Sequence, residues 1–311
     1  MDDNDFSLNV SIIIVNYNTK QLLADCLKSI YEQTKDISFE VIVSDNGSVD
    51  GSIEMLKTDF PQVILIENNA NLGFGAANNR GLAVAKGKYI FYLNSDTILL
   101  NNAVKIFFDY WEENGEKENL GALGCNLQNI NGNTVHSGDT LPTSIDFSNH
   151  LHTLYGFTKL TLLSIFFHKK LPLPVPRNSK KHLGDIGYII GADLFVRNDE
   201  SAKFDEDFFM YYEEIYLQWL LQRKKKKRII IDTPKIIHLE GASSKKVLID
   251  IIHKETSFSS IQNRISGIIY FSKIGIHPAK IIFLKFLTIL LWLNPILFKN
   301  NKKYIKKVIL A

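Results

Sequence analysis

The chain has 311 residues, of which 45% are hydrophobic and 22% are charged, and its formal net charge is +3. This composition argues against a disordered chain, and the length allows about two domains with a full hydrophobic core. Two cysteines, Cys26 and Cys125, are too few for a disulfide framework or a four-thiolate zinc site. We therefore expect a folded protein of a reducing compartment, the cytoplasm.

The charge is unevenly distributed. Residues 245–311 contain 12 lysines or arginines and 2 acidic residues, so a mildly acidic body precedes a basic, apolar tail. The longest apolar stretch, 281–298, is interrupted by Lys285, Asn294 and Pro295 and is too broken to span a bilayer. The N-terminal sequence MDDNDFSLN lacks the pattern of a signal peptide. The tail predicts helices that lie on an anionic membrane, at the inner face of the cytoplasmic membrane; the alternative is a solvated pair of basic helices.

Two kinds of segment alternate over the first 125 residues. Continuous β-branched or aromatic runs predict strands that are buried on both faces, and apolar residues at helical spacing predict helices. This alternation predicts an α/β fold with a mostly parallel central sheet flanked by helices. In such sheets, ligands bind at the carboxyl ends of the strands. The strands are predicted at 10–15, 39–43, 63–66, 89–93 and 120–125, and the helices at 19–33, 74–85 and 103–111.

The second half of the chain is less regular. Residues 128–134 (QNINGNT) predict a hairpin turn, because Asn-Gly readily adopts positive φ. Residues 150–176 end in three spaced prolines and predict a lid or a membrane-facing loop. From about Val247 the pattern is helical to the end, which divides the chain into 1–245 and a helical extension, 246–311. Strand character returns at 185–196, 228–231 and 235–238, with a short helix at 213–222.

Polar loops follow the first two predicted strands. Asn16, Tyr17 and Asn18 come directly after the first strand, and an aromatic face beside amide groups suits a planar base. Asp45 and Asn46 come after the second strand, where a carboxylate can accept a hydrogen bond from the imide N–H of uracil or thymine. Helix-capping turns are the alternative interpretation of both loops.

The third and fourth loops are suited to phosphate and metal. Gly73 and Gly75 begin a helix whose N-terminus can attract phosphate, and Arg80 either reaches a diphosphate or pairs with a surface carboxylate. Asp96 ends the tetrapeptide LNSD directly after a strand, where it can bind a divalent ion that bridges two phosphates. A helix cap is again the alternative for Asp96. The sequence contains neither a P-loop nor a GxGxxG motif after the first strand.

In combination, these four loops resemble the inverting family-2 glycosyltransferases of the GT-A fold, and especially their bacterial rhamnosyltransferase-like branch. The resemblance runs from about Val10 to Ser244. It implies that Asp45 contacts the base and that Asp96 is the metal-binding acid of the DXD-type motif, whose first acid is replaced by Asn94. The remaining donor-binding positions that it implies are Asn16, Tyr17, Asn18, Asn46, Gly73, Arg80 and Ser95.

The second half resembles the same family. GADLFVR (191–197) resembles its strand beside the acceptor site, which places Gly191, Ala192 and Asp193 on the acceptor side. FDEDFFMYYEE (204–214) resembles FDExFFxYxED, whose last acid is the general base; that position is Glu214, with Glu213 as the alternative. The alternative for both acids is a structural role at a helix N-terminus. His238 begins HLEGASS, which resembles an element whose histidine often completes the metal site.

The resemblance implies an inverting hexosyltransferase with Mg²⁺ or Mn²⁺ as cofactor. The donor would be dTDP-rhamnose or a UDP-sugar, and the acceptor a glycan or lipid-linked glycan in cell-surface polysaccharide or O-antigen assembly. Tyr216 stands where the family has a further acid and Leu220 where it usually has arginine. These departures leave a second hypothesis, a sugar-nucleotide-binding protein with weak or lost transferase activity. Nucleic acid is not expected as a partner, because the basic residues lack interleaved stacking aromatics.

Overall fold

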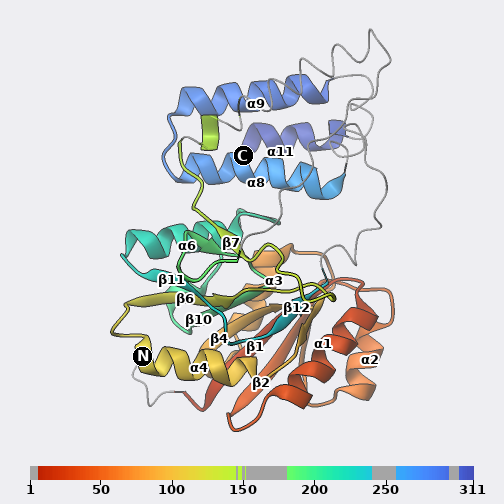
Figure 1. Cartoon of the computed structure of the whole chain (residues 1–311). Coiled ribbons are helices and arrows are strands. Elements are labelled where there is room, and N and C mark those ends of the chain that lie inside the picture. The colour runs from red at the N-terminus through yellow and green to blue at the C-terminus, as the bar shows by residue number, and fades with distance from the viewer. Residues whose placement is uncertain (1–5, 145, 149–150, 152–180, 240–256, 294–300) are drawn as a thin grey trace. The chain divides into compact units, whose positions relative to one another are not determined.

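The computed structural model describes residues 6–144, 146–148, 151, 181–239, 257–293 and 301–311 (Figure 1). The chain divides into two compact units, and each is considered by itself. The first contains the described parts of 1–141, 178–206 and 213–245; the second contains those of 142–177, 207–212 and 246–311. The predicted loop at 150–176 and the predicted boundary near residue 245 fall almost entirely outside the described residues.

An eight-stranded sheet forms the centre of the first unit, in the order β3-β2-β1-β4-β10-β6-β11-β8. Strands β10 and β8 are antiparallel to their neighbours, and the other six strands run in one direction. The predicted α/β fold with a mostly parallel sheet is therefore confirmed. The strands are β1 (Leu8–Asn16), β2 (Phe39–Asp45), β3 (Ile64–Glu67), β4 (Gly87–Asn94), β6 (Leu120–Cys125), β8 (Gly184–Asp185), β10 (Asp193–Arg197) and β11 (Lys227–Ile231).

Helices flank this sheet and bury their apolar stripes against it. Alternate residues of β1 belong to two different core clusters: Ile12 and Ile14 to one, and Ile13 to the other. The strand is thus buried on both faces, which explains its unbroken β-branched sequence. The helices of this unit are α1 (Lys20–Gln33), α2 (Ser52–Asp59), α3 (Phe74–Leu82), α4 (Ala103–Asn114) and α6 (Glu213–Arg223), with a short 3₁₀ turn at Glu200–Ala202.

Two small antiparallel ribbons accompany the main sheet. β5 (Thr97–Leu99) pairs with β12 (Ile236–His238), and β7 (Gly138–Asp139) pairs with β9 (Tyr188–Ile189). The single strand region predicted at 185–196 is in fact divided among β8, β9 and β10. The chain passes close to another backbone there, because a Cβ at Gly187 would lie 2.2 Å from the backbone nitrogen of Leu141. The predicted Asn-Gly turn is confirmed: Gly132 has a φ of +77°.

The described part of the second unit is mainly helical, as the sequence predicts. It contains α8 (Phe258–Lys273), α9 (Pro278–Trp292), a 3₁₀ turn (Lys302–Tyr304) and α11 (Ile305–Leu310). Phe147 packs edge-on against Phe271 with ring centroids 5.1 Å apart, and the Tyr270 hydroxyl donates to the Pro142 carbonyl at 3.0 Å. Within the described residues, every helix falls short of the length and apolarity that a bilayer crossing requires.

Candidate functional site

Strand register collects the predicted site residues at one edge of the sheet. Asn16 lies opposite Asp45 across β1 and β2, and Val15 lies opposite Asn94 across β1 and β4. Farther along, Leu93 lies opposite Asp193, where β10 begins. The side chains predicted to bind donor and acceptor therefore come from four adjacent strands, at the edge where the carboxyl ends of parallel strands gather their loops.

Asp45 holds the first two loops together. Asn16 Nδ2 donates to Asp45 Oδ2 at 2.7 Å, and the backbone N–H of Ser48 donates to Asp45 Oδ1 at 2.7 Å. The Asn16 amide also donates to the Ser48 hydroxyl at 3.0 Å. Asp45 is fully buried, and both of its carboxylate oxygens already accept hydrogen bonds from the loop residues. Its contact with a base stays a prediction.

The base-side loop presents one exposed aromatic ring. Tyr17 is 49% exposed, whereas its neighbour Asn16 is buried. Asn18 has a φ of +55°, and its Oδ1 accepts the Val49 N–H at 2.8 Å. The loop is therefore fixed by its amides, while the tyrosine ring is left open to stack on a planar group.

The second loop also fixes the start of α3. The buried amide of Asn46 donates to the Gly73 carbonyl at 3.0 Å and accepts from Asn68 Nδ2 at 3.1 Å. Gly73 has a φ of +88°, which favours glycine. Arg80 lies exposed in the last turn of α3, about 10 Å along the axis from Gly73. The structure does not bring the Arg80 backbone to the N-terminus of α3, and its contact with a diphosphate stays a prediction.

A hydroxyl pair connects the base-side loop to the LNSD loop. Thr19 Oγ1 donates to Asn16 Oδ1 at 2.6 Å and lies 3.0 Å from Ser95 Oγ. Hydrogen bonds therefore run from Asp45 through Asn16 and Thr19 to Ser95, the residue before Asp96. Two loops that are 76 positions apart in sequence are coupled in this way.

The two predicted metal ligands lie side by side. Asp96 Oδ1 is 3.3 Å from His238 Nε2, and the two side chains are 16% and 10% exposed, respectively. The ribbon of β5 and β12 places them, because His238 pairs with Thr97 and the Leu239 N–H donates to the Asp96 carbonyl at 2.9 Å. A carboxylate oxygen beside an imidazole nitrogen is a donor set that fits Mn²⁺ and tolerates Mg²⁺.

This pair would supply only part of a coordination shell. Among the described residues, no group of three or more histidine, cysteine, aspartate or glutamate side chains is placed to hold a metal. Substrate phosphate oxygens and water would have to complete the shell, which is how proteins commonly bind Mg²⁺.

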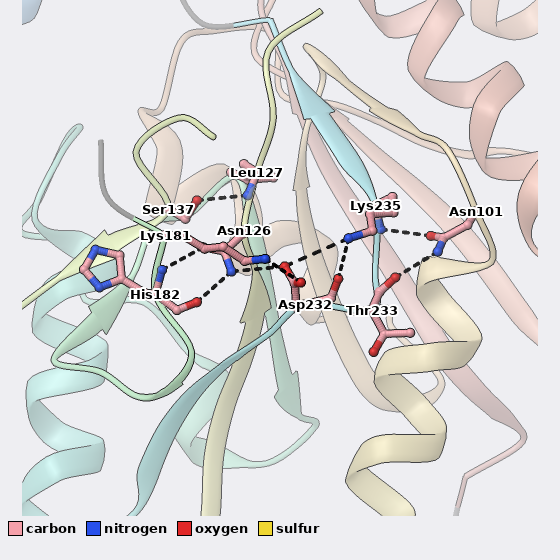
Figure 2. Close-up of polar contacts among 9 residues, drawn as sticks. All are labelled: Asn101, Asn126, Leu127, Ser137, Lys181, His182, Asp232, Thr233 and Lys235. Atoms are coloured by element: carbon pink, nitrogen blue, oxygen red, sulfur yellow. Dashed lines mark hydrogen bonds and ion pairs between the residues drawn. The ribbon is translucent and has the colours of Figure 1, made fainter. Parts of the chain in front are cut away.

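A polar clamp, not foreseen from the sequence, holds β12 in place (Figure 2). Asn101 Oδ1 accepts the Lys235 N–H at 2.9 Å, and Asn101 Nδ2 donates to the Thr233 carbonyl at 2.9 Å. On the other side, Asp232 forms an ion pair with Lys181 at 2.6 Å. Asn126 Nδ2 donates to the His182 carbonyl at 2.6 Å in the same cluster. These contacts fix the turn before His238, and their partners are too far apart in sequence to be recognised from a motif.

The acceptor-side turn adjoins the LNSD loop. The Asn94 N–H donates to the Ala192 carbonyl at 3.1 Å. Asp193 is fully buried and its Oδ2 accepts the Cys125 N–H at 2.7 Å; burial raises the pKa of Asp193 to about 7. A Cβ at Gly191 would lie 3.1 Å from Phe74 Cε1 and 3.8 Å from Glu214 Cβ. The predicted base therefore lies beside the predicted acceptor turn.

Glu213 and Glu214 begin α6, at the end of the helix where the macrodipole favours acids. Glu213 is buried, whereas Glu214 is partly exposed as a residue, although its carboxyl oxygen Oε2 is buried. Glu214 Oε2 has no hydrogen-bond partner among the residues that the structure describes, and burial raises the pKa of Glu214 to about 7. Gln218 anchors this helix by donating to the carbonyls of Glu214 and Ile189. The carboxyl group of Glu214 thus has a pKa suited to proton transfer near neutral pH.

The fold and this row of loops define the GT-A class of nucleotide-diphospho-sugar transferases. Residues 11–168, half of the chain, match the model of glycosyl transferase family 2, and the chain belongs to that family.

Several known proteins are similar to this chain. Poly(ribitol-phosphate) beta-glucosyltransferase of Bacillus spizizenii is 31% identical over 176 residues, which is 54% of this chain and 27% of that protein. The chain thus spans about a quarter of that relative. Mannosyltransferase PcManGT from Pyrobaculum calidifontis, solved with GDP-Man and Mn²⁺, has a TM-score of 0.54 at 15% identity, over 100% of this chain and 75% of that one. Staphylococcus aureus TarS 1–349 with UDP-GlcNAc has a TM-score of 0.50 at 13% identity, over 96% and 73%.

Proposed function

We propose that this chain is an inverting glycosyltransferase that moves a hexose from a UDP- or dTDP-linked donor, such as dTDP-rhamnose, to a hydroxyl of a glycan or lipid-linked glycan. One observation carries the proposal: the loop that bears Asp96 and the residue Glu214 both adjoin the turn at residues 191–193. Asn94, two residues before Asp96, donates to the Ala192 carbonyl, and Glu214 lies beside Gly191. A relative that acts on poly(ribitol phosphate) supports a role in building a cell-surface polymer.

The donor would lie along the strand-end row. The exposed ring of Tyr17 is available to stack on the base, beside the loop that Asp45 and Asn16 hold rigid. The N-terminus of α3, which Asn46 fixes through Gly73, offers backbone N–H groups and a positive dipole end to phosphate. Fixed loops reduce the entropy lost on binding, which favours both affinity and alignment.

Asp96 and His238 would hold a divalent cation together with the donor's phosphate oxygens. When bound, such a cation offsets the negative charge of a leaving diphosphate. The protein's own contribution is to orient the two ligands through the ribbon of β5 and β12. Buried surroundings strengthen this electrostatic effect, because little water competes.

Glu214 would accept the proton of the acceptor hydroxyl. The hydroxyl oxygen attacks the anomeric carbon from the face opposite the diphosphate, so the new C–O bond forms as the old one breaks and the configuration inverts. Glu214 leaves the step protonated, and the diphosphate carries away the electron pair. At neutral pH about half of the molecules have such a base deprotonated and ready to act. Its pKa of about 7 also makes it a stronger proton acceptor than an ordinary carboxylate.

A thermal-shift screen tests donor binding. UDP-, dTDP- and GDP-sugars are compared with Mn²⁺ or Mg²⁺, and a true donor at 100-fold excess over Kd should stabilise the fold by about 2.7 kcal/mol. Release of nucleoside diphosphate is then measured with and without a glycan acceptor. If no nucleotide sugar stabilises the protein, the proposal is refuted.

A sugar-nucleotide-binding protein without turnover is the second candidate. It is favoured by the residues that follow the proposed base: Tyr216 stacks on Trp219 with ring centroids 5.6 Å apart, and Leu220 is 40% exposed. Neither side chain supplies the charge that the family usually has at these positions. Donor-induced stabilisation without release of diphosphate, across a panel of glycan acceptors, would identify this function.

A further inference from the structure

Helix α9 exposes a continuous apolar surface. Its outer face consists of Ile282, Phe283, Phe286, Leu290 and Leu293, which follow helical spacing and are 42–66% exposed. The opposite side of the same helix, which includes Leu284 and Leu291, is buried. A helix that is apolar all round is normally covered on every side. Among the residues that the structure describes, none covers the outer face of α9, and its side chains form a stripe rather than isolated exposed residues.

Neighbouring α11 adds to the exposed apolar surface. Ile309 is 57% exposed and Leu310 is 74% exposed. Lys285 Nζ donates to the Ile309 carbonyl at 3.1 Å, so this part of α11 lies next to α9. Figure 1 shows α8, α9 and α11 as neighbouring helices of the second unit.

The charged side chains of the C-terminal segment, to which this surface belongs, are all of one sign. Residues 257–311 contain nine lysines or arginines and no acidic residue. Lys280, just before the outer face, is exposed, as are Lys302 and Lys303 in the 3₁₀ turn and Lys306 and Lys307 in α11. A second copy of the chain would bring the same positive charge, so electrostatics disfavours self-association through this surface. An anionic partner with an apolar interior matches both properties.

The length of α9 favours an orientation parallel to a membrane surface. Its 15 residues span about 22 Å, which is shorter than the roughly 30 Å of a bilayer's hydrocarbon core. The helix can therefore lie along a membrane surface with its outer face at the acyl boundary, as interfacial helices do. Lysines at its borders would then reach the lipid phosphates.

We propose that the outer face of α9, together with the lysines of residues 302–307, docks this chain on an anionic lipid bilayer. The proposal goes beyond the transferase activity and does not depend on it. Neither part of the surface suffices alone: the apolar side chains supply the burial energy, and the lysines supply selectivity for anionic lipid.

Vesicle co-sedimentation of the full chain tests the proposal. Vesicles of phosphatidylcholine alone are compared with vesicles that contain 30% phosphatidylglycerol, at two salt concentrations. We expect about tenfold tighter partitioning onto the anionic vesicles, weakened by salt. The double variant Phe283→Gln/Phe286→Gln and the quadruple variant K302Q/K303Q/K306Q/K307Q should each lose about tenfold in partitioning. Ile130→Gln is the matched control, because Ile130 is 75% exposed in a turn of the first unit.

Three results would overturn the proposal. The wild-type chain could stay in the supernatant with both kinds of vesicle, or the Phe283→Gln/Phe286→Gln variant could sediment like the wild type. Alternatively, light scattering could show a dimer that the same substitutions dissociate, in which case the surface is a contact between copies. Melting curves establish that each variant is folded. Donor-induced stabilisation, measured without vesicles, separates failure of this proposal from failure of the transferase function.

Discussion

Asp96 and His238 are 142 positions apart in the sequence, yet Asp96 Oδ1 lies 3.3 Å from His238 Nε2. The two short strands β5 and β12 create this proximity, since residue 97 pairs with residue 238. Neither residue lies in a motif that alone specifies a metal. Their proximity in the fold makes the two side chains a candidate pair of metal ligands.

Replacing either member of this pair should remove metal dependence. Asp96→Asn keeps the size of the side chain but removes its charge, and His238→Ala removes the imidazole. For each variant we expect at least about a 100-fold fall in diphosphate release, because stabilisation of the leaving group by a metal supplies several kcal/mol. The assay is a Mn²⁺ titration at saturating donor. Asp109→Asn is the control, because Asp109 pairs with Lys105 at the surface. If a variant keeps the wild-type Mn²⁺ response, the residue that it replaces is not a metal ligand.

The clamp at Asn101 gives a second prediction. Asn101→Ala removes the hydrogen bonds to Lys235 and Thr233, which should cost about 1–3 kcal/mol of unfolding free energy. Because those bonds fix the turn before His238, the apparent Mn²⁺ affinity should also fall. Asn101→Asp, which keeps the acceptor for the Lys235 N–H, should recover part of both losses.

Two measurements separate positioning from general stability. Asn114→Ala removes a hydrogen bond to the Tyr110 carbonyl elsewhere in the first unit and should leave the Mn²⁺ titration unchanged. Denaturant melts report the stability of each variant, and the metal titration reports the geometry at His238. If Asn101→Ala lowers stability with no change in Mn²⁺ response, Asn101 supports the fold only.

The sequence predicts much of this molecule because its signals are local. Buried β-branched runs such as Val10–Val15 identify strands. Because these strands are parallel, the residues that follow them share one edge of the sheet, as Asn16, Asp45 and Asn94 do. Three short strands within 184–197 could not be separated in advance, because long-range contacts, such as the close approach of Gly187 to Leu141, decide where they break. The polar clamp was missed for the same reason: Asn101 and Thr233 are 132 positions apart.

Asp45→Asn should weaken donor binding more than turnover. The carboxylate accepts hydrogen bonds from both Asn16 Nδ2 and the Ser48 N–H. The NH₂ group of an asparagine in its place would face one of these two N–H groups and could not accept its hydrogen bond. We expect the loop to loosen and the Kd of the nucleotide sugar to rise about tenfold, with a smaller change in kcat. Calorimetric titration of the donor measures the Kd. An unchanged Kd would show that the loop geometry does not depend on this charge and that Asp45 does not contact the base.

Glu214 gives a prediction for the pH dependence of activity. Its pKa is raised to about 7 by burial, and a general base acts only when it is deprotonated. The rate should therefore be level above about pH 7 and fall tenfold per unit below it. Glu214→Gln cannot accept the proton, and we expect kcat to fall by about 10²–10⁴-fold while donor affinity stays the same. Glu213→Gln, measured alongside, tests the alternative base.

The same carboxyl group makes an independent prediction for stability. Its pKa is about 7 in the folded chain and 4.5 as a free group, so between these values the folded state holds a proton that the unfolded state has lost. Folding is then linked to proton uptake, and the unfolding free energy should decrease as pH rises from about 4.5 to 7. Glu214→Gln should reduce the slope of that part of the curve, measured by denaturant melts at each pH, and leave the contribution of Asp193, whose pKa is also raised. If the variant keeps the wild-type pH dependence in both rate and stability, Glu214 does not titrate near neutrality and cannot be the base proposed here.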